Sequence, residues 1–198
     1  NGCTLPVTPF RVEQRDELNL GLDSTDVTCF ADRDGTITGT ITGGVGPYSW
    51  VADDPTATSG TTAAINVTGL SGNRFYKVTV TDSLGCPKVD SIFVNEPIEL
   101  VSSFLNTTQY PNCANTASGN IDITFSGGNG NESFNWSGPS VNAGNQTLQN
   151  QSNLLQGTYS VTITDAKGCF VIKDTTLNDP IPILGNLTFD QPSCLGGG

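Results

Sequence analysis

The chain has 198 residues, of which 35% are hydrophobic, and its 8 Lys and Arg against 19 Asp and Glu give a net charge of −11. This acidic balance repels phosphate backbones and anionic lipid surfaces, so the sequence predicts no nucleic-acid partner. The chain has no run of about 18 or more apolar residues, which predicts no membrane insertion.

The first clearly patterned segment is GTITGTIT, at residues 35–42. Ile37, Gly39 and Ile41 fall on one face and the threonines fall on the other, which is the period of a half-buried antiparallel strand. A Gly-Gly pair follows at 43–44 and predicts a turn. The next short strand contains Trp50.

The segment FYKVTVTDSLGC, at residues 75–86, shows the same alternation. Tyr76, Val78 and Val80 share one face, and Lys and Thr residues share the other. The DSLG turn places Asp first and Gly fourth in a type I β-turn, where the Asp side chain can accept hydrogen bonds from backbone amides. We therefore expect a hairpin whose second strand begins at Cys86.

The second half of the chain repeats these features at a nearly constant interval. TYSVTITDAKGC, at 158–169, matches the hairpin segment and lies 83 positions after it. GNIDITFS, at 119–126, matches the first strand and is followed by its own Gly-Gly pair and by Trp136. Such self-similarity predicts a tandem array.

The fold class predicted from these elements is all-β, with tandem immunoglobulin-like β-sandwich repeats of about 83 residues. We expect the two repeats at 29–112 and 113–193. Residues 1–28 then form the C-terminal strands of a preceding repeat, and 194–198 begin a further one. The aromatic residues expected in the cores, two of them as tyrosine corners, are Trp50, Trp136, Tyr76 and Tyr159.

The six cysteines are regularly placed in a chain without histidine: Cys3, Cys29, Cys86, Cys113, Cys169 and Cys194. This usage predicts disulfides in an extracellular, oxidising compartment. The opening residues NGCTLPV lack the pattern of a signal peptide, so we expect any targeting signal to lie outside this sequence.

The pairing of the cysteines follows from an expected geometry. A bond from Cys29 to Cys86 within one repeat would have to span the length of a strand, roughly 25 Å, whereas a disulfide needs Cα atoms within about 7 Å. If the segment IELVSSF returns beside the strand that follows Cys86, then Cys113 comes back near Cys86. We therefore expect bonds across each junction, Cys3–Cys29, Cys86–Cys113 and Cys169–Cys194. A bond from Cys29 to Cys169 between neighbouring units is the main rival.

Residues for catalysis, metals or cofactors are sparse. Without histidine, a Ser or Cys nucleophile lacks its commonest base. Paired carboxylates at Asp53 and Asp54, or at Asp32 and Asp34, lie in polar loops and have no clear equivalents in the second copy. The segment ADRDG at 31–35 offers oxygen ligands for calcium, but the second copy has ANTASG there. We therefore predict no enzymatic activity, no catalytic residues, no bound metal and no cofactor.

The combined pattern resembles the SprB-type repeat. The resemblance is carried by GTITGTITGGVGPYSW and LSGNRFYKVTVTDSLGC in the first copy, and by GNIDITFSGGNGNESFNW and LQGTYSVTITDAKGC in the second. The second copy departs from the pattern where NESF replaces the Pro-Tyr segment. The resemblance implies a long cell-surface adhesin or filament of gliding bacteria and their relatives, associated with type IX secretion. It also implies O-glycosylation at Asp-Ser/Thr motifs, here at Ser83, Ser91 and Thr175.

Two functions follow as hypotheses. The first is a structural stalk segment of an extracellular adhesin or surface filament, whose partners are neighbouring repeats of the same chain and other fibre chains. The second is a module that binds surface glycans through loops or exposed tryptophans. They differ over Trp50 and Trp136, which a stalk buries and a glycan platform exposes.

Overall fold

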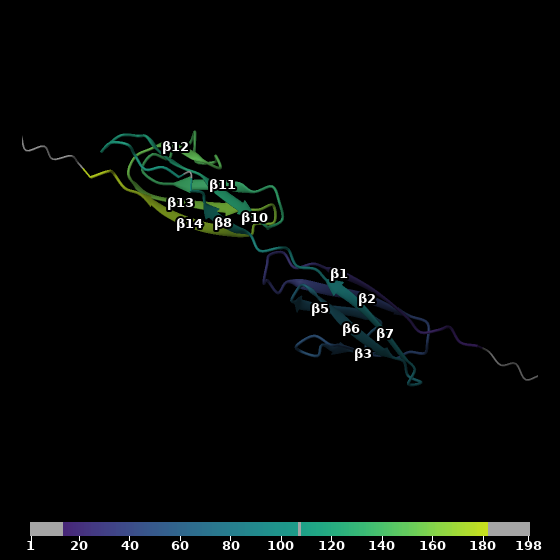
Figure 1. Cartoon of the computed structure of the whole chain (residues 1–198). Helices are drawn as coiled ribbons and strands as arrows, with labels where there is room; N and C mark the ends of the chain where they lie inside the picture. Colours follow the sequence, from purple (N-terminus) through teal and green to yellow (C-terminus); the bar gives the residue numbers. More distant parts are fainter. Residues whose placement is uncertain (1–13, 107, 182–198) are drawn as a thin grey trace, which may run out of the picture. The chain divides into compact units, whose positions relative to one another are not determined.

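The computed structural model describes residues 14–106 and 108–181, and these residues form fourteen strands and no helix (Figure 1). The chain divides into two compact units. Unit 1 comprises Asn1–Glu99 with Gly127–Asn129, and unit 2 comprises Leu100–Ser126 with Gly130–Gly198. The all-β fold class is as the alternation of the sequence predicts.

Unit 1 is a sandwich of two antiparallel sheets with strand orders β1-β2-β5 and β4-β3-β6-β7. Its strands are β1 Asn19–Thr25, β2 Gly35–Thr42, β3 Ser49–Ala52, β4 Ser59–Gly60, β5 Ala64–Leu70, β6 Arg74–Thr81 and β7 Pro87–Val94. The first, second and fifth strands share one sheet, and the third, sixth and seventh share the other, as in immunoglobulin domains.

The core of unit 1 lies between these two sheets. Ile37 and Ile41 of β2 pack in one hydrophobic cluster with Tyr76, Val78 and Val80 of β6. These are the inward residues that the period-two pattern predicts, and Lys77 between them is exposed. Burial of alternate side chains therefore fixes which face of each strand meets the other sheet.

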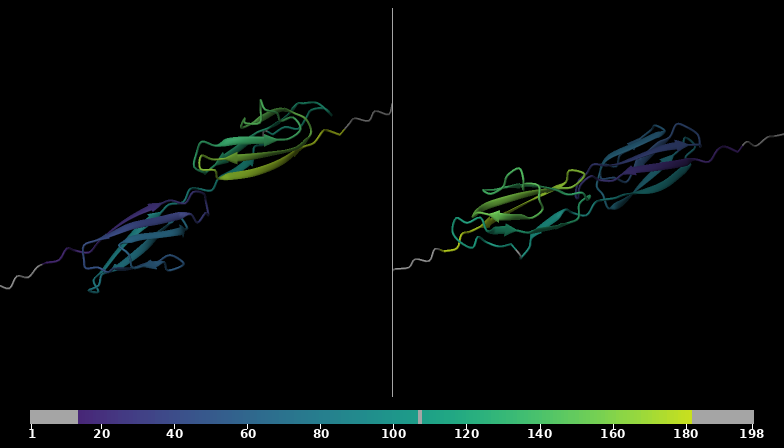
Figure 2. Two further views of the ribbon diagram at one scale, coloured as in Figure 1. Left: turned by 180° about the vertical axis from the view of Figure 1, so that it is seen from behind. Right: turned by 90° about the horizontal axis from the view of Figure 1, so that it is seen from above.

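Unit 2 repeats this plan, and Figure 2 shows its sheets from two further directions. Its strands are β8 Val101–Phe104, β9 Gly119–Ile121, β10 Ile123–Ser126, β11 Ser133–Ser137, β12 Gln151–Leu154, β13 Gly157–Thr164 and β14 Phe170–Leu177. The order β11-β13-β14 corresponds to β3-β6-β7 of unit 1. Its core includes Ile121, Ile123, Val161 and Ile163.

The strand predicted at 119–126 is divided in two at Asp122. β9 pairs with β12, whereas β10 pairs with β8. The amide of Leu105 donates to the Asp122 carbonyl (2.8 Å), so the backbone at the break is held by the loop that follows β8. The inward alternation continues across the break, because Ile121 and Ile123 are both buried.

The expected repeat boundaries at 29 and 113 are wrong. β1 pairs with β2 along its whole length, so Asn19–Thr25 belongs to the sandwich of unit 1 and not to a preceding repeat. Similarly, β8 pairs with β10, which places the start of unit 2 at Leu100, before Cys113. Residues 194–198 lie outside the described residues.

Candidate functional site

The repeated Asp-x-x-Gly-Cys turn is the most regular local structure in the chain. In unit 1, the Asp82 Oδ1 atom accepts hydrogen bonds from the amides of Leu84 and Cys86, both at 2.9 Å, and Oδ2 accepts one from the Val45 amide at 3.1 Å. The Gly85 amide donates to the Asp82 carbonyl (3.0 Å), and Gly85 has a φ of +82°. The turn and its Asp cap are as the sequence predicts.

Unit 2 builds the same turn with the same pair of amide contacts to the Oδ1 atom of the aspartate. The Asp165 Oδ1 atom accepts hydrogen bonds from the amides of Lys167 (2.9 Å) and Cys169 (3.0 Å). Gly168 has a φ of +90°, and its amide donates to the Asp165 carbonyl (3.1 Å). Both aspartates are buried, so the carboxylates act as internal caps.

The amide of Cys86 is the main cause of a lowered pKa at Asp82. Burial opposes this effect, and the amides of Val45 and Leu84 add to it. A carboxylate that accepts several backbone hydrogen bonds is stabilised in its charged form, so Asp82 stays ionised and keeps the turn closed at neutral pH.

The four described cysteines differ in state. Cys29 and Cys169 are disulfide-bonded, whereas Cys86 and Cys113 are free and exposed. The expected bond from Cys86 to Cys113 is therefore wrong. It required the segment IELVSSF to return beside β7, but β8 within that segment pairs with β10 of unit 2. Cys3 and Cys194 lie outside the described residues, and the rival bond from Cys29 to Cys169 stays a prediction.

The loops that follow Cys29 and Cys113 also share one geometry. The Cys29 carbonyl accepts from the Asp32 amide (3.1 Å), and the Cys113 carbonyl accepts from the Thr116 amide (3.2 Å). The residue two positions after each cysteine has a positive φ, +63° at Ala31 and +58° at Asn115.

A carboxylate near the end of each unit holds this loop. Glu96 Oε1 accepts the Ala31 amide (2.8 Å), and Asp179 Oδ2 accepts the Asn115 amide (2.9 Å). Both carboxylates precede a proline. The recurrence of an acidic residue before proline was a signal for this role that sequence reasoning did not use.

The tryptophans and tyrosines lie in the cores. Trp50 is 7% exposed and Trp136 is 2% exposed, and neither Tyr76 nor Tyr159 has any exposed surface. The Tyr76 hydroxyl donates to the Ser71 carbonyl (2.9 Å), and the Tyr159 hydroxyl donates to the Leu155 carbonyl (2.8 Å). These bonds to backbone a few residues upstream are the geometry of a tyrosine corner. A glycan platform built on the tryptophans is thereby excluded.

The three serine and threonine residues proposed for O-glycosylation are placed differently. Ser83 is exposed, but its hydroxyl donates to the Val45 carbonyl (2.9 Å). Ser91 is exposed and lies opposite Lys77 on the outer face of its sheet. Thr175 lies opposite the buried Tyr159 and is half-buried. Ser83 and Ser91 are therefore both exposed and Thr175 is not fully so, and modification of the three residues stays a prediction.

Of the four carboxylates considered for catalysis or calcium, those of Asp34, Asp53 and Asp54 accept hydrogen bonds that hold loops, whereas Asp32 contributes its backbone amide to the loop after Cys29. Asp54 accepts hydrogen bonds from the amides and hydroxyls of Thr56 and Thr58, and Asp53 accepts the Lys77 amide. Asp34 accepts the Thr28 amide (2.9 Å). In the part of the chain that the structure describes, no three His, Cys, Asp or Glu residues are grouped to hold a metal ion.

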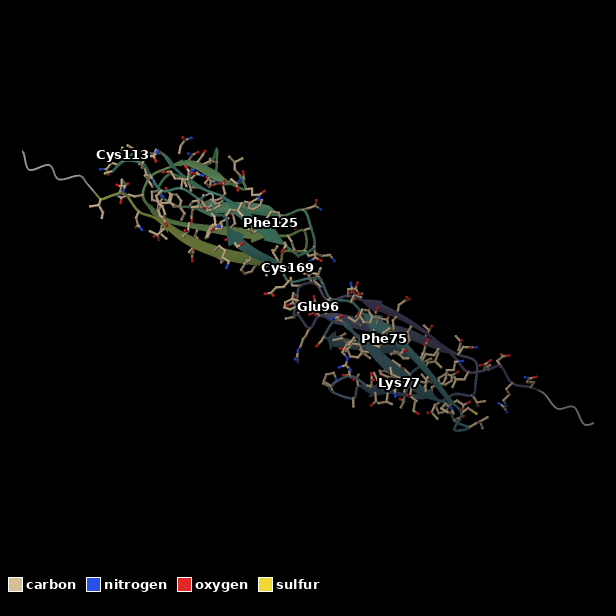
Figure 3. All side chains as sticks on the ribbon, viewed as in Figure 1. Phe75, Lys77, Glu96, Cys113, Phe125 and Cys169 are labelled. Carbon is tan, nitrogen blue, oxygen red and sulfur yellow. The ribbon has the colours of Figure 1, made fainter. Side chains whose placement is uncertain are left out.

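Exposed apolar side chains gather on the outer face of the β4-β3-β6-β7 sheet. Phe75 and Phe93 are cross-strand partners with ring centroids 4.9 Å apart in an edge-to-face arrangement. Phe75 is 66% exposed, and Figure 3 marks it beside Lys77 of the same strand. Val51 of β3 and Val89 of β7 are also exposed on this face, but the Lys77–Ser91 pair separates them from the two phenylalanines. Sequence reasoning missed this patch because Phe75 occupies an outward position in a strand that otherwise alternates regularly.

The strand order, the tyrosine corners and the matching turns define each unit as an immunoglobulin-like β-sandwich. In a comparison with protein families, residues 21–55 match the family described as SprB repeat, which confirms the resemblance over β1, β2 and β3. No curated protein matches the chain.

Three solved structures illustrate the range of similar folds. The C-terminal 282-residue fragment of intimin, crystallised with the intimin-binding domain of its translocated receptor, is 14% identical, with a TM-score of 0.42. The match covers 84% of this chain and 65% of the intimin fragment, so the chain spans less than two thirds of that structure. The DIP-gamma IG1+IG2 structure is 12% identical with a TM-score of 0.35, and the match covers 80% of this chain and 96% of that structure. A chimeric titin Z1Z2 tandem is 12% identical with a TM-score of 0.31, and the match covers 81% of this chain and 98% of the tandem.

Proposed function

We propose that this chain is a structural stalk segment of a long extracellular adhesin or surface filament, built from tandem immunoglobulin-like units. The observation that carries the proposal is the repetition of one plan in both units. The turn, the cysteine loop and the tyrosine corner recur with matching hydrogen bonds. In repeat proteins such units add length, since each contacts mainly its neighbours.

The use of polar groups supports a structural role. Asp54, Asp82 and Asp165 are the buried carboxylates among the described residues, and the hydrogen bonds of each hold a nearby loop. A catalytic carboxylate instead needs an oxygen aimed at a substrate. That the chain is not an enzyme stays a prediction.

The cysteine state and the family match support an extracellular location. Cys29 and Cys169 are disulfide-bonded, and stable disulfides are characteristic of oxidising compartments. The SprB repeat resemblance implies a cell-surface protein, and it is matched here at residues 21–55. Within residues 14–106 and 108–181, no helix is long and apolar enough to cross a membrane.

Single-molecule pulling tests the proposal that the units act as independent spacers. With the disulfides reduced, stretching the chain by its two ends should give two separate unfolding events, one for each unit. A single cooperative event would contradict the proposal, because the chain would then be one folded body and not an array.

A binding module is the second candidate function, and the exposed pair Phe75 and Phe93 favours it. Exposed apolar patches often mark interaction sites. Replacing both residues with Ser should abolish binding to glycan arrays or to cell surfaces if this face is a ligand site. Phe170→Ser is the control, because Phe170 on β14 of unit 2 is 64% exposed, close to the 66% of Phe75. Unchanged binding after the double substitution would exclude the patch as the site.

A further inference from the structure

The four described cysteines fall into two positional classes. Cys86 and Cys169 close the Asp-x-x-Gly-Cys turn of their units, and we call them turn cysteines. Cys29 and Cys113 begin the loop that the Glu96 or Asp179 carboxylate holds, and we call them start cysteines. Each unit therefore has one cysteine of each class.

Members of one class are equivalent in backbone geometry but not in oxidation state. The turn cysteine amides donate to the aspartate at 2.9 Å for Cys86 and at 3.0 Å for Cys169. Cys169 is disulfide-bonded and Cys86 is a free thiol. Among the start cysteines, Cys29 is bonded and Cys113 is free. The local structure around both free thiols thus already supports a disulfide in the other unit.

Both free thiols are also accessible. Cys86 and Cys113 are exposed, and Figure 3 marks Cys113 at the edge of its unit. Hydrogen-bonded loops hold each sulfur near the surface, so little backbone conformational entropy remains to be lost when a disulfide forms. Cys86 belongs to unit 1 and Cys113 belongs to unit 2.

We infer that Cys86 and Cys113 are linkage points for other units of the same fold, and that the turn cysteine of one copy of the chain bonds to the start cysteine of another. The two bonded cysteines, Cys29 and Cys169, are one start and one turn cysteine, and the two free cysteines offer the same two classes. Linking unlike classes is a heterologous contact, so it can repeat without closing on itself.

Formation of the link is an oxidation of two thiols. The two S–H bonds break, one S–S bond forms, and two protons and two electrons pass to an external disulfide such as oxidised glutathione, which is reduced to two thiols. The reaction proceeds by thiolate attack through a mixed disulfide, as in ordinary thiol–disulfide exchange.

The test uses the full chain with Cys3→Ser and Cys194→Ser, so that the four described cysteines remain. Thiol titration of the unfolded protein should find two free thiols, and four would overturn the inference by showing that Cys29 and Cys169 had bonded to the removed residues. Oxidation with glutathione should then give a ladder of covalent oligomers on non-reducing electrophoresis, which a reductant returns to monomer.

Two further variants in this background decide the pairing rule. Cys86→Ser and Cys113→Ser should each stay monomeric alone, and an equimolar mixture of the two should stop at a dimer joined from Cys113 to Cys86. Dimers of either variant alone would show that two turn cysteines or two start cysteines can bond, and would overturn the inferred pairing of a turn cysteine with a start cysteine. A mixture that stays monomeric, or a parental chain that loses both thiols as a monomer, would overturn the linkage itself. The stalk proposal has a separate readout, the number of unfolding events in the reduced chain.

Discussion

At the residue scale, single buried polar groups hold the loops of each unit. Asp82 accepts three backbone amides from two different segments, and Asp54 accepts two threonine amides and their hydroxyls. Burial raises the pKa of Asp54, but the hydrogen bonds from Thr56 and Thr58 outweigh it and lower the pKa overall. These carboxylates are therefore structural anions.

The lowered pKa of Asp82 predicts a pH-dependent stability. Because the folded pKa lies below the unfolded value of 3.8, the stabilisation is fully present above pH 3.8 and is lost as the pH falls through the folded pKa. Asp82→Asn should lower the melting temperature at pH 7, and the difference from the parent should shrink below pH 3.8. Asp174→Asn, on the exposed face of β14, is the charge-matched control. A difference that is independent of pH would contradict the anion's role.

The two core tryptophans give a second prediction at this scale. Replacing Trp50 or Trp136 with Ala should destabilise its unit by about 3–5 kcal/mol, because either ring is buried. Substitution with Phe should distinguish the two positions by their loss of stability. The Trp136 indole donates to the Leu148 carbonyl (2.9 Å), whereas the buried Trp50 indole nitrogen has no hydrogen-bond partner in the structure.

Trp136→Phe should therefore cost about 1 kcal/mol more than Trp50→Phe, since only the former breaks a hydrogen bond. Chemical denaturation measures both variants, with Phe125→Leu as a control for partial loss of packing in unit 2. Equal losses in the two Phe variants would show that the hydrogen bond contributes nothing.

At the element scale, the Gly-Gly pair after the first long strand packs against preceding backbone in both copies. A Cβ built on Gly43 would lie 1.9 Å from the Glu17 carbonyl oxygen, and one on Gly127 would lie 1.9 Å from that of Glu99. Gly43 has a φ of +67° and Gly127 a φ of +83°. No side chain fits at the first glycine of either pair.

This contact predicts a difference between two glycine substitutions. Gly85→Ala introduces only a side chain at positive φ, with open space around it, and should cost about 1–2 kcal/mol. Gly43→Ala adds a backbone clash to a similar φ and should cost more than Gly85→Ala in the same thermal unfolding assay. If the two variants were equally stable, the close approach at Gly43 would not matter.

The elements also show how far sequence could predict the structure. Alternation identified β2, β6 and β13, since their inward side chains are strongly apolar. It missed β1, whose sequence NLGLDST offers two half-buried leucines. The Asp-Gly turn was predictable because its chemistry is local. The Cys86 pairing was not, because it depended on which strand β8 would join, and that choice is long-range.

A one-residue shift explains why the glycosylation motifs are not equivalent. Ser91 pairs with Lys77, but Thr175 pairs with Tyr159, the residue in β13 that corresponds to Tyr76. Adjacent residues in a strand face opposite ways, so the two similar motifs present their hydroxyls to opposite faces. The spacing contains this shift, because Ser91 and Thr175 are 84 positions apart whereas Tyr76 and Tyr159 are 83 apart.

At the scale of the whole molecule, the two sandwiches share a plan and differ in which of their two described cysteines is disulfide-bonded. Alkylation of the native chain with iodoacetamide, followed by peptide mapping without reductant, should label Cys86 and Cys113 but not Cys29 or Cys169. The same map identifies the partners of the bonded cysteines. Protection of Cys86 or Cys113 in freshly prepared monomer would contradict the described state.

The central claim is that these units act as spacers in an array, and electron microscopy of chains with two, four and eight units tests it most directly. An eight-residue strand such as β6 spans roughly 25 Å, so each added unit should lengthen the particle by at least about that distance. The contour length should rise in proportion to the number of units. Compact particles whose longest dimension does not rise in that proportion would contradict it.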